Sequence, residues 1–500
     1  MQKKKLTLVI VSLLVVVLSV SLAYFTAQII GKGKDVSVTS ANLQIVFTDS
    51  DGALTETDIE PGWSATKTFT IKNDTKTEYK YNIVIKDLLN TFVTEGYLQY
   101  KITSTNDGYN MTEFKDIPKS SIATDTILAY SVVIPNGVTQ SYTIEFKYAN
   151  DENVDQSDDM GKQLSGTLFI TEGTEDPNKT LYNQLLVDKS TVLTRTNFSK
   201  VLTDNNTNTL YTSTEDSKTV YYFAGNATDN WVKFGKNASN QDLYWRIIRT
   251  NSEGSIRLLY HGTSTTATNA YIGTIKFNST YNDAMYVGYM YGTSGSQVNN
   301  RTNTNSSTIK GVIDTWYKDN LNSNYGKYLS ATAIYCNDRS VTSGTYSVSS
   351  SFGYSAKTRL DVNKTPTYNC ADTNDKFTAD TSTGNGKLTY PIALMTADEV
   401  SFAGGKYGSN APTWYYYNSA NESSTGSTWW WVLSPYIWDG SYAHVFGVHG
   451  SSWPGLLNSN LVLDTGGVRP VTSLKSCVKY SSGDGTATNP YTIQETTSGC

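Results

Sequence analysis

The sequence predicts a mainly β protein with a second domain of mixed α and β structure. Charged residues make up only 17% of the 500 residues, whereas 36 are tyrosines. Much of the remaining polarity comes from Thr, Ser, Asn and Gly, and short alternating apolar and polar runs are separated by Gly, Asn, Asp and Pro. This composition favours strands and polar turns over helices. The formal charge of −5 shows no basic excess, so we expect no nucleic-acid partner.

The N-terminus predicts export. Residues Lys3, Lys4 and Lys5 precede an apolar run from Leu6 to about Phe25, and small residues follow. This order is typical of a signal peptide, but the run is also close to the length that spans a bilayer. We therefore expect residues 1–31 to be a signal peptide or an uncleaved signal anchor. The remainder of the chain is then secreted or on the cell surface, with the membrane as a partner if the segment is not cut.

Residues 35–172 predict a β-sandwich domain. About seven alternating segments are separated by turn sequences such as Asp51-Gly52, Pro61-Gly62 and Asn136-Gly137. The expected strands cover residues 42–47, 66–71, 79–85, 99–103, 131–134, 141–148 and 163–171. The polar residues 173–180 then predict a linker.

Two motifs in this half resemble the camelysin and biofilm-fibre family of surface proteins. They are the signal region LAYFTAQI, and Pro61-Gly62-Trp63 followed by Phe69, Ile71 and Asn73. The resemblance implies a sandwich, and it permits a structural fibre or matrix subunit that assembles through this domain. The domain contains no histidine and therefore no zinc-protease motif.

Residues 181–475 predict a second domain that contains both strands and helices. A short helix begins at Leu181, and residues 243–250 and 255–260 predict a hairpin. Apolar residues from Ile309 to Leu321 fall at helical spacing, and Thr396 with Glu399 has the spacing of a capping box. We expect a loop at residues 340–383, and a closing strand and tail at 476–500.

Four cysteines in an exported chain predict disulfides rather than a zinc site. The spacing contains no C-x-x-C motif, and three pairings are open. We favour the sequence-local one, Cys336 with Cys370 and Cys477 with Cys500.

The segment from Trp429 to Pro470 predicts a contact surface. An aromatic triplet opens it, Gly466 to Pro470 closes it, and residues 436–464 hold no Lys, Arg, Glu, Gln, Met or Cys. Aromatic residues with Ser, Gly and Asn beside them are typical of binding loops, although aromatic residues also fill strand cores. We expect the ligand contacts at Tyr436, Trp438, Asp439, Tyr442, His444, Phe446, His449, Ser451 and Trp453.

The W-W-x-x-S-P opening and G-V-R-P closure, with Ala443 and Gly450 between them, resemble domains of gut Firmicutes surface proteins. Those domains are similar to the C-type-lectin-like fold of formylglycine-generating enzymes and of the variable proteins of diversity-generating retroelements. The resemblance implies a C-type-lectin-like, adhesin-like domain for a protein or glycan ligand, with residues 436–464 open to diversification. Trp429 and Trp430 would then pack beneath the surface, and Arg469 would bind backbone carbonyls.

The sequence does not favour an enzyme. The three histidines, His261, His444 and His449, form no metal motif, and no G-x-S-x-G turn is present. The cysteines lie outside the formylglycine-generating motif, and Asp439 with Asp464 supplies too few ligands for calcium. We therefore expect no catalytic residues, no metal and no cofactor. A glycan or peptide hydrolase is the remaining alternative, but the aromatic region shows no paired carboxylates.

Overall fold

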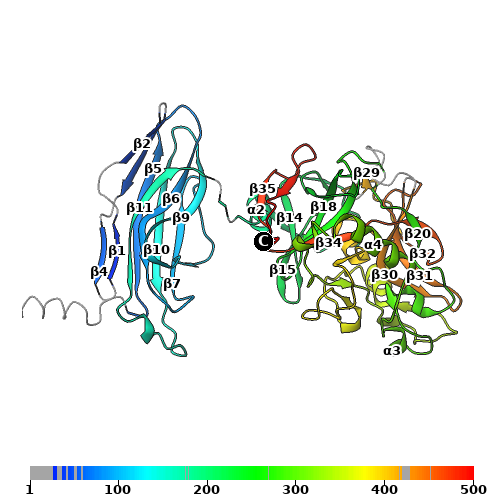
Figure 1. Cartoon of the computed structure of the whole chain (residues 1–500). Helices are drawn as coiled ribbons and strands as arrows, with labels where there is room; N and C mark the ends of the chain where they lie inside the picture. The colour runs from blue at the N-terminus through cyan, green and yellow to red at the C-terminus, as the bar shows by residue number, and fades with distance from the viewer. Residues whose placement is uncertain are drawn as a thin grey trace, which may run out of the picture. The chain divides into compact units, whose positions relative to one another are not determined.

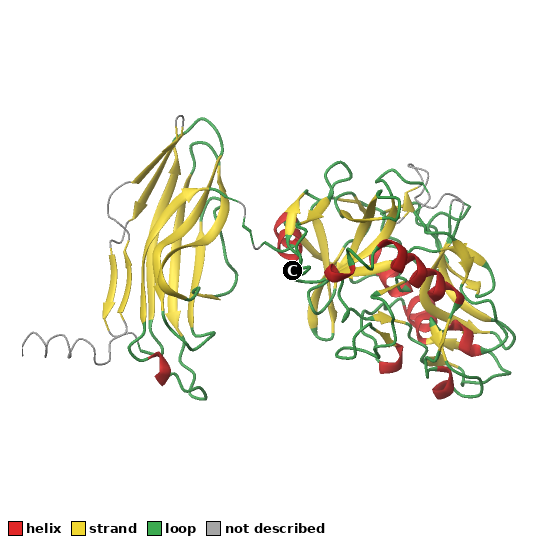
Figure 2. Cartoon of the chain, in the orientation of Figure 1, coloured by secondary structure: helices red, strands yellow, loops and turns green. Residues whose placement is uncertain are grey.

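The computed structural model describes two compact units, divided after Pro177. It describes residues 26–30, 36–40, 43–49, 53–57, 60–174, 176–177, 179–268, 270–415, 417–418, 428–450 and 452–500. The expected signal peptide or anchor therefore lies almost entirely outside the described residues. Strand residues make up 40% and helix residues 13% of the structure, so the protein is mainly β (Figures 1 and 2).

Unit 1, residues 1–177, contains two sheets that share one hydrophobic core. The first has the order β4 (Ala53–Thr57), β1 (Thr26–Ile30), β11 (Gln163–Glu172), β6 (Tyr79–Asn90) and β9 (Ser120–Ile134). The second has the order β2 (Val36–Ser40), β3 (Leu43–Asp49), β5 (Ser64–Asn73), β10 (Thr139–Tyr148), β7 (Leu98–Ser104) and β8 (Lys115–Asp116). Figure 2 draws the short helical turn Ser157–Asp159 of this unit in red.

Alternation along these strands explains the shared core. In β10 every second side chain is buried, including Tyr142, Ile144 and Phe146, and β11 repeats the pattern with Leu168 and Ile170. Successive side chains of a strand point to opposite faces, so each sheet turns one apolar face to the core. All seven strands expected here are present, and β1, β2, β4 and β8 were not anticipated.

Unit 2, residues 178–500, is built around two larger sheets. The ten-stranded sheet contains β12 (Thr191–Thr194), β14 (Thr209–Glu215), β15 (Lys218–Tyr222), β17 (Trp231–Lys236), β18 (Asp242–Thr250), β19 (Ile256–Gly262), β27 (Ile392–Ala393), β34 (Val471–Leu474), β35 (Tyr480–Ser482) and β36 (Tyr491–Ile493). The seven-stranded sheet contains β20 (Thr274–Lys276), β24 (Val341–Ser343), β25 (Phe352–Tyr354), β30 (Trp430–Trp438), β31 (Ala443–Val448), β32 (Leu457–Leu461) and β33 (Thr465–Gly467).

Short pairs and helices complete unit 2. The two-stranded pairs are β13 (Asn205–Asn206) with β16 (Asn226–Ala227), β21 (Met290–Tyr291) with β22 (Asn305–Ser306), β23 (Tyr335–Cys336) with β26 (Lys376–Phe377), and β28 (Thr413–Trp414) with β29 (Tyr417–Asn418). The α-helices are α2 (Leu181–Asp188), α3 (Gln297–Asn300), α4 (Thr308–Asn320), α5 (Ser355–Lys357) and α6 (Ala397–Ala403). The remaining helical turns are Ala284–Val287, Gly326–Tyr328, Thr358–Asn363 and Thr373–Asp375.

The predicted helix starts and the predicted hairpin of unit 2 are confirmed. Helix α4 starts after Ser307, whose side chain accepts the Lys310 N–H, and α6 has the full capping box of Thr396 and Glu399. The expected hairpin is β18–β19, whose turn places Gly254 at a φ of +83°.

The expectation of a loop over residues 340–383 is wrong, because β24, β25 and α5 form there. The segment pairs with β30, so its structure comes from tertiary contact rather than from its own periodicity.

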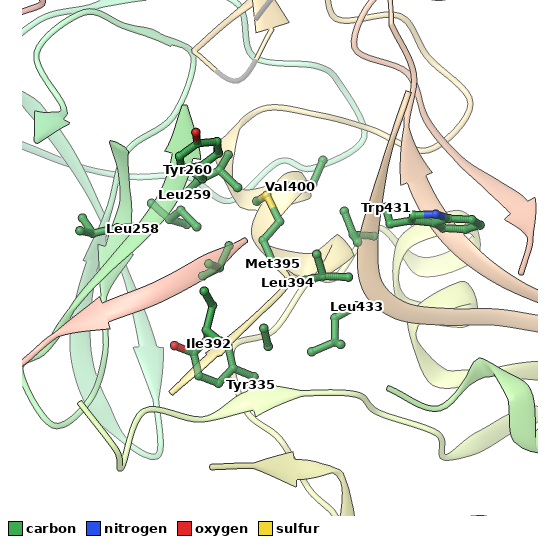
Figure 3. Packing of buried hydrophobic residues seen from close by; sticks show 14 of the residues in the cluster. Leu258, Leu259, Tyr260, Tyr335, Ile392, Leu394, Met395, Val400, Trp431 and Leu433 are labelled. Atoms are coloured by element: carbon green, nitrogen blue, oxygen red, sulfur yellow. The ribbon is translucent and has the colours of Figure 1, made fainter. Parts of the chain in front are cut away.

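One core joins the two sheets of unit 2. Figure 3 shows Leu258 and Leu259 of β19 on one side, Trp431 and Leu433 of β30 on the other, and Met395 between them.

The disulfides pair Cys336 with Cys370 and Cys477 with Cys500, which confirms the sequence-local pairing. These bonds are compatible with an extracellular protein.

Candidate ligand-binding surface

The expected contact residues lie mainly on β30, β31 and the two turns that flank β31. Strand β30 pairs with β31, and β31 pairs with β32, all antiparallel. Trp430 and Trp431 are fully buried in β30. Arg469 is also buried: its Nε and Nη2 donate to the Tyr260 carbonyl, at 3.3 and 3.2 Å, and its guanidinium lies 4.9 Å from the Trp430 ring. This places Arg469 against a backbone carbonyl, as the sequence led us to expect.

The expected exposure is wrong for Trp438 and Phe446, which are 1% and 0% exposed. Trp438 lies where β25 extends the sheet, and Phe352 is its register partner. Phe446 is covered because the rings of Tyr407 and Tyr436 pack edge-on against it, at 5.9 and 5.0 Å. Both residues belong to the scaffold and cannot meet a ligand at the surface.

The exposed residues form two groups at opposite ends of β31. Tyr442, 39% exposed, comes directly before the strand, and Trp453, 57% exposed, lies in the turn that follows it. A strand of six residues spans roughly 20 Å. The structure therefore does not gather the expected contacts on one face.

The first group, the Tyr442 surface, consists of Tyr281, Asp439, Tyr442 and His444. The Tyr442 ring stacks on the Tyr281 ring at 5.1 Å with an interplanar angle of 12°, and the Tyr281 carbonyl accepts the Ala443 N–H. Tyr281 is itself 38% exposed. Sequence reasoning missed Tyr281 because its role depends on a long-range contact that no local motif marks.

Asp439 organises the turn beneath this stack. Its Oδ1 accepts the backbone N–H groups of Ser441 and Tyr442 at 2.8 and 2.7 Å, and its Oδ2 lies 3.0 Å from His444 Nε2. Partial burial alone would raise the pKa of Asp439, but the hydrogen bonds from His444 and the two N–H groups hold the pKa below its ordinary value. The surface thus combines two open aromatic rings with an ionised carboxylate on a hydrogen-bonded turn.

The second group consists of Trp429, His449 and Trp453. The His449 ring lies 6.1 Å from that of Trp429 and 6.5 Å from that of Trp453, and burial lowers the pKa of His449. Trp429 lies flat against Gly466, where a Cβ would come within 2.6 Å of the ring. The Trp429 ring therefore packs against the Gly466 backbone. Ser451, another expected contact, lies outside the described residues.

Tyr436 belongs to neither group. Its hydroxyl lies 2.7 Å from that of Tyr407 and 3.4 Å from Asp361 Oδ2, and its side chain is partly buried. Burial and these two neighbours raise the pKa of Tyr436, so its hydroxyl stays protonated. The Tyr436 hydroxyl is thus used in hydrogen bonds within the protein, next to Phe446.

Within the described residues, no group of three or more His, Cys, Asp or Glu side chains could hold a metal ion. The helices of the same part of the chain include none that is long and apolar enough to cross a membrane. Neither a protein-family model nor a curated protein matches this chain.

Proposed function

We propose that the protein is a secreted or surface-displayed, adhesin-like protein that binds a protein or glycan ligand through the Tyr442 surface. Unit 1 would be a camelysin-like β-sandwich that acts as a stalk, and unit 2 a C-type-lectin-like domain that displays the site. The two sheets around one core in unit 1 support the first assignment. The two disulfides support an extracellular location.

The observation that carries this proposal is the exposed Tyr281–Tyr442 stack, held by the Asp439 turn. Large aromatic side chains contribute much contact area for little loss of side-chain entropy, and they dominate binding hot spots. Asp439 fixes the turn through two backbone N–H groups, so the turn loses little further conformational entropy when a ligand binds. Both a sugar ring and an apolar or basic side chain can pack on such a surface.

The contact set is therefore smaller than the sequence predicted. We retain Asp439, Tyr442 and His444, and we add Tyr281. If a retroelement diversifies residues 436–464, a buried tryptophan at 438 suits an invariant scaffold position. A neighbouring reverse transcriptase gene with a near-copy of these codons, differing mainly at adenines, would establish diversification.

The test is a binding screen of the full chain on arrays of glycans and extracellular proteins. For ligands found with the native protein, Tyr442→Ala should weaken binding by about 2 kcal/mol, which is roughly thirtyfold in Kd. Trp453→Ala is the matched control, because it removes an exposed aromatic ring at the other end of β31. Loss of binding in Trp453→Ala with no change in Tyr442→Ala would contradict the assignment.

A further inference from the structure

A lysine and an aspartate form a fully buried ion pair near the start of unit 2. Lys189 follows the last residue of α2, and Asp229 lies between β16 and β17. The Lys189 Nζ is 2.8 Å from Asp229 Oδ2, and the two side chains are 0% and 2% exposed. The pair joins two segments that no described disulfide connects.

Other lysine–carboxylate pairs with both partners in the described residues are more exposed. Lys310 and Asp314 are the most similar to this pair in burial, but both residues belong to helix α4, and the Asp314 side chain is 21% exposed. Burial matters because charges in a protein interior lose their hydration, even when they are paired. In its neutral form, such a pair is an amine nucleophile beside a carboxylic acid.

The surroundings distinguish the two oxygens of Asp229. Oδ2 accepts the Asn208 N–H at 2.7 Å, whereas the buried Oδ1 has no hydrogen-bond partner. A backbone N–H at this distance can stabilise negative charge that develops on a carbonyl oxygen. The arrangement therefore holds Oδ2 in place and leaves Oδ1 as the oxygen that can depart.

Groups around the amine hold it in place. Nζ also donates to the Asp484 carbonyl at 3.3 Å, and it lies 5.5 Å from the centre of the Tyr491 ring. The Tyr491 hydroxyl donates to Asp188 Oδ2 at 2.8 Å, which fixes the ring. These contacts keep the nitrogen against the Asp229 carboxyl group.

We propose that Lys189 and Asp229 become joined by an amide bond between Nζ and Cγ. After proton transfer within the pair, the Nζ lone pair forms the bond to Cγ, and the Asn208 N–H stabilises the charge on Oδ2. The Cγ–Oδ1 bond then breaks, and Oδ1 leaves as water with two protons that both came from Nζ, which keeps one hydrogen in the amide. No oxidant or cofactor is required, and the fixed geometry supplies the high effective concentration that the condensation needs.

The product would tie α2 to the segment that enters β17. It would also replace two buried charges by a neutral amide, which removes the cost of their lost hydration. Because the disulfides lie at residues 336–500, this bond would be a covalent tie in the first part of unit 2.

The test is mass spectrometry of the purified full chain, reduced and denatured before digestion after lysine. The bond predicts no cleavage after Lys189 and a branched product of residues 180–200 and 219–233, lighter than the sum of its parts by one water molecule. Separate linear peptides ending at Lys189 and containing Asp229 would overturn the proposal and leave an ordinary ion pair. The pair Lys310–Asp314 is the internal control, and its peptides should be linear.

Lys189→Arg is the matched variant, because a guanidinium keeps the positive charge but stays protonated. Its digest should contain the residue 219–233 peptide in linear form and no branched product. If this variant does not fold, the digest of the native protein still decides the question. A branched product that persists in Lys189→Arg would assign the linkage to another residue and overturn the proposal.

Discussion

The two units bury their strands in different ways. In unit 1, β10 and β11 have one buried face, and the apolar side chains alternate with partly exposed ones. In unit 2, every residue of β19 is buried, as are the first six residues of β30. Alternation therefore reveals which side chains face the core in unit 1. In unit 2 it does not, because these strands are covered on both faces.

The units also differ in how they accommodate buried charge. In unit 1, Asp159 is buried against the backbone N–H groups of Val93 and Thr94 and the Tyr148 hydroxyl. In unit 2, Glu399 lies between the guanidinium groups of Arg249 and Arg257, at 2.9 and 2.7 Å. Buried ion pairs that depend on one another make unit 2 the more sensitive to single substitutions.

The largest expected effect is at this network. Glu399→Ala should destabilise unit 2 by about 3–5 kcal/mol, because it leaves two buried arginines without their shared carboxylate. Nine of the ten tryptophans lie in unit 2, with Trp63 in unit 1, so fluorescence during urea unfolding reports mainly on unit 2. Hydrogen exchange of residues 60–174 should not change. A parallel loss of protection there would show that the units unfold together.

A second comparison separates buried from exposed tryptophan. Trp438→Ala should cost about 3–5 kcal/mol, as for a large core side chain, while Trp453→Ala should change stability by less than about 0.5 kcal/mol. Urea unfolding of both variants measures the difference. Equal costs would mean that the turn after β31 is buried in solution.

The units should also respond differently to mild acid. Burial, with Arg469 and Arg246 nearby, holds the pKa of His261 well below its ordinary value, and no histidine lies in residues 1–177. A base with a depressed folded pKa binds protons first in the unfolded chain, so stability falls as pH drops below about 6.5. Unit 2 should lose up to about 1.4 kcal/mol per pH unit from this residue. His261→Gln should remove that component of the slope between pH 6.5 and 5.5.

At still lower pH, Glu399 in the ion-pair network with Arg249 and Arg257 should become protonated. Burial alone would raise the pKa of Glu399, but Arg257 and Arg249 hold it below its ordinary value. Stability from a depressed carboxyl pKa is present above the unfolded pKa and is lost as pH falls below roughly 4. Urea midpoints measured across this range should show a second decline in unit 2. A flat response below pH 4 would contradict the role given to this network.

The smallest loss of stability that we expect at a buried residue is at Thr396. Thr396→Ala removes the side chain that accepts the Glu399 N–H at the start of α6, and it should cost about 1 kcal/mol. Thr396→Ser keeps the hydroxyl and should retain most of the stability. The same urea unfolding measures both variants, and equal losses would mean that packing of the Thr396 methyl group matters more than the cap.

The sequence by itself determined the local elements and the mainly β class. The seven expected strands of unit 1, the cap and apolar face of α4, and the β18–β19 hairpin depend on residues close in the chain, whose spacing carries the signal. Tertiary structure alone decided which aromatic residues of the 436–464 segment are exposed. Trp438 is buried beside β25, which pairs with its strand, whereas Tyr442 is partly exposed and stacks on the ring of Tyr281. Both neighbours lie far away in sequence, and burial depends on what packs against a side chain rather than on its type.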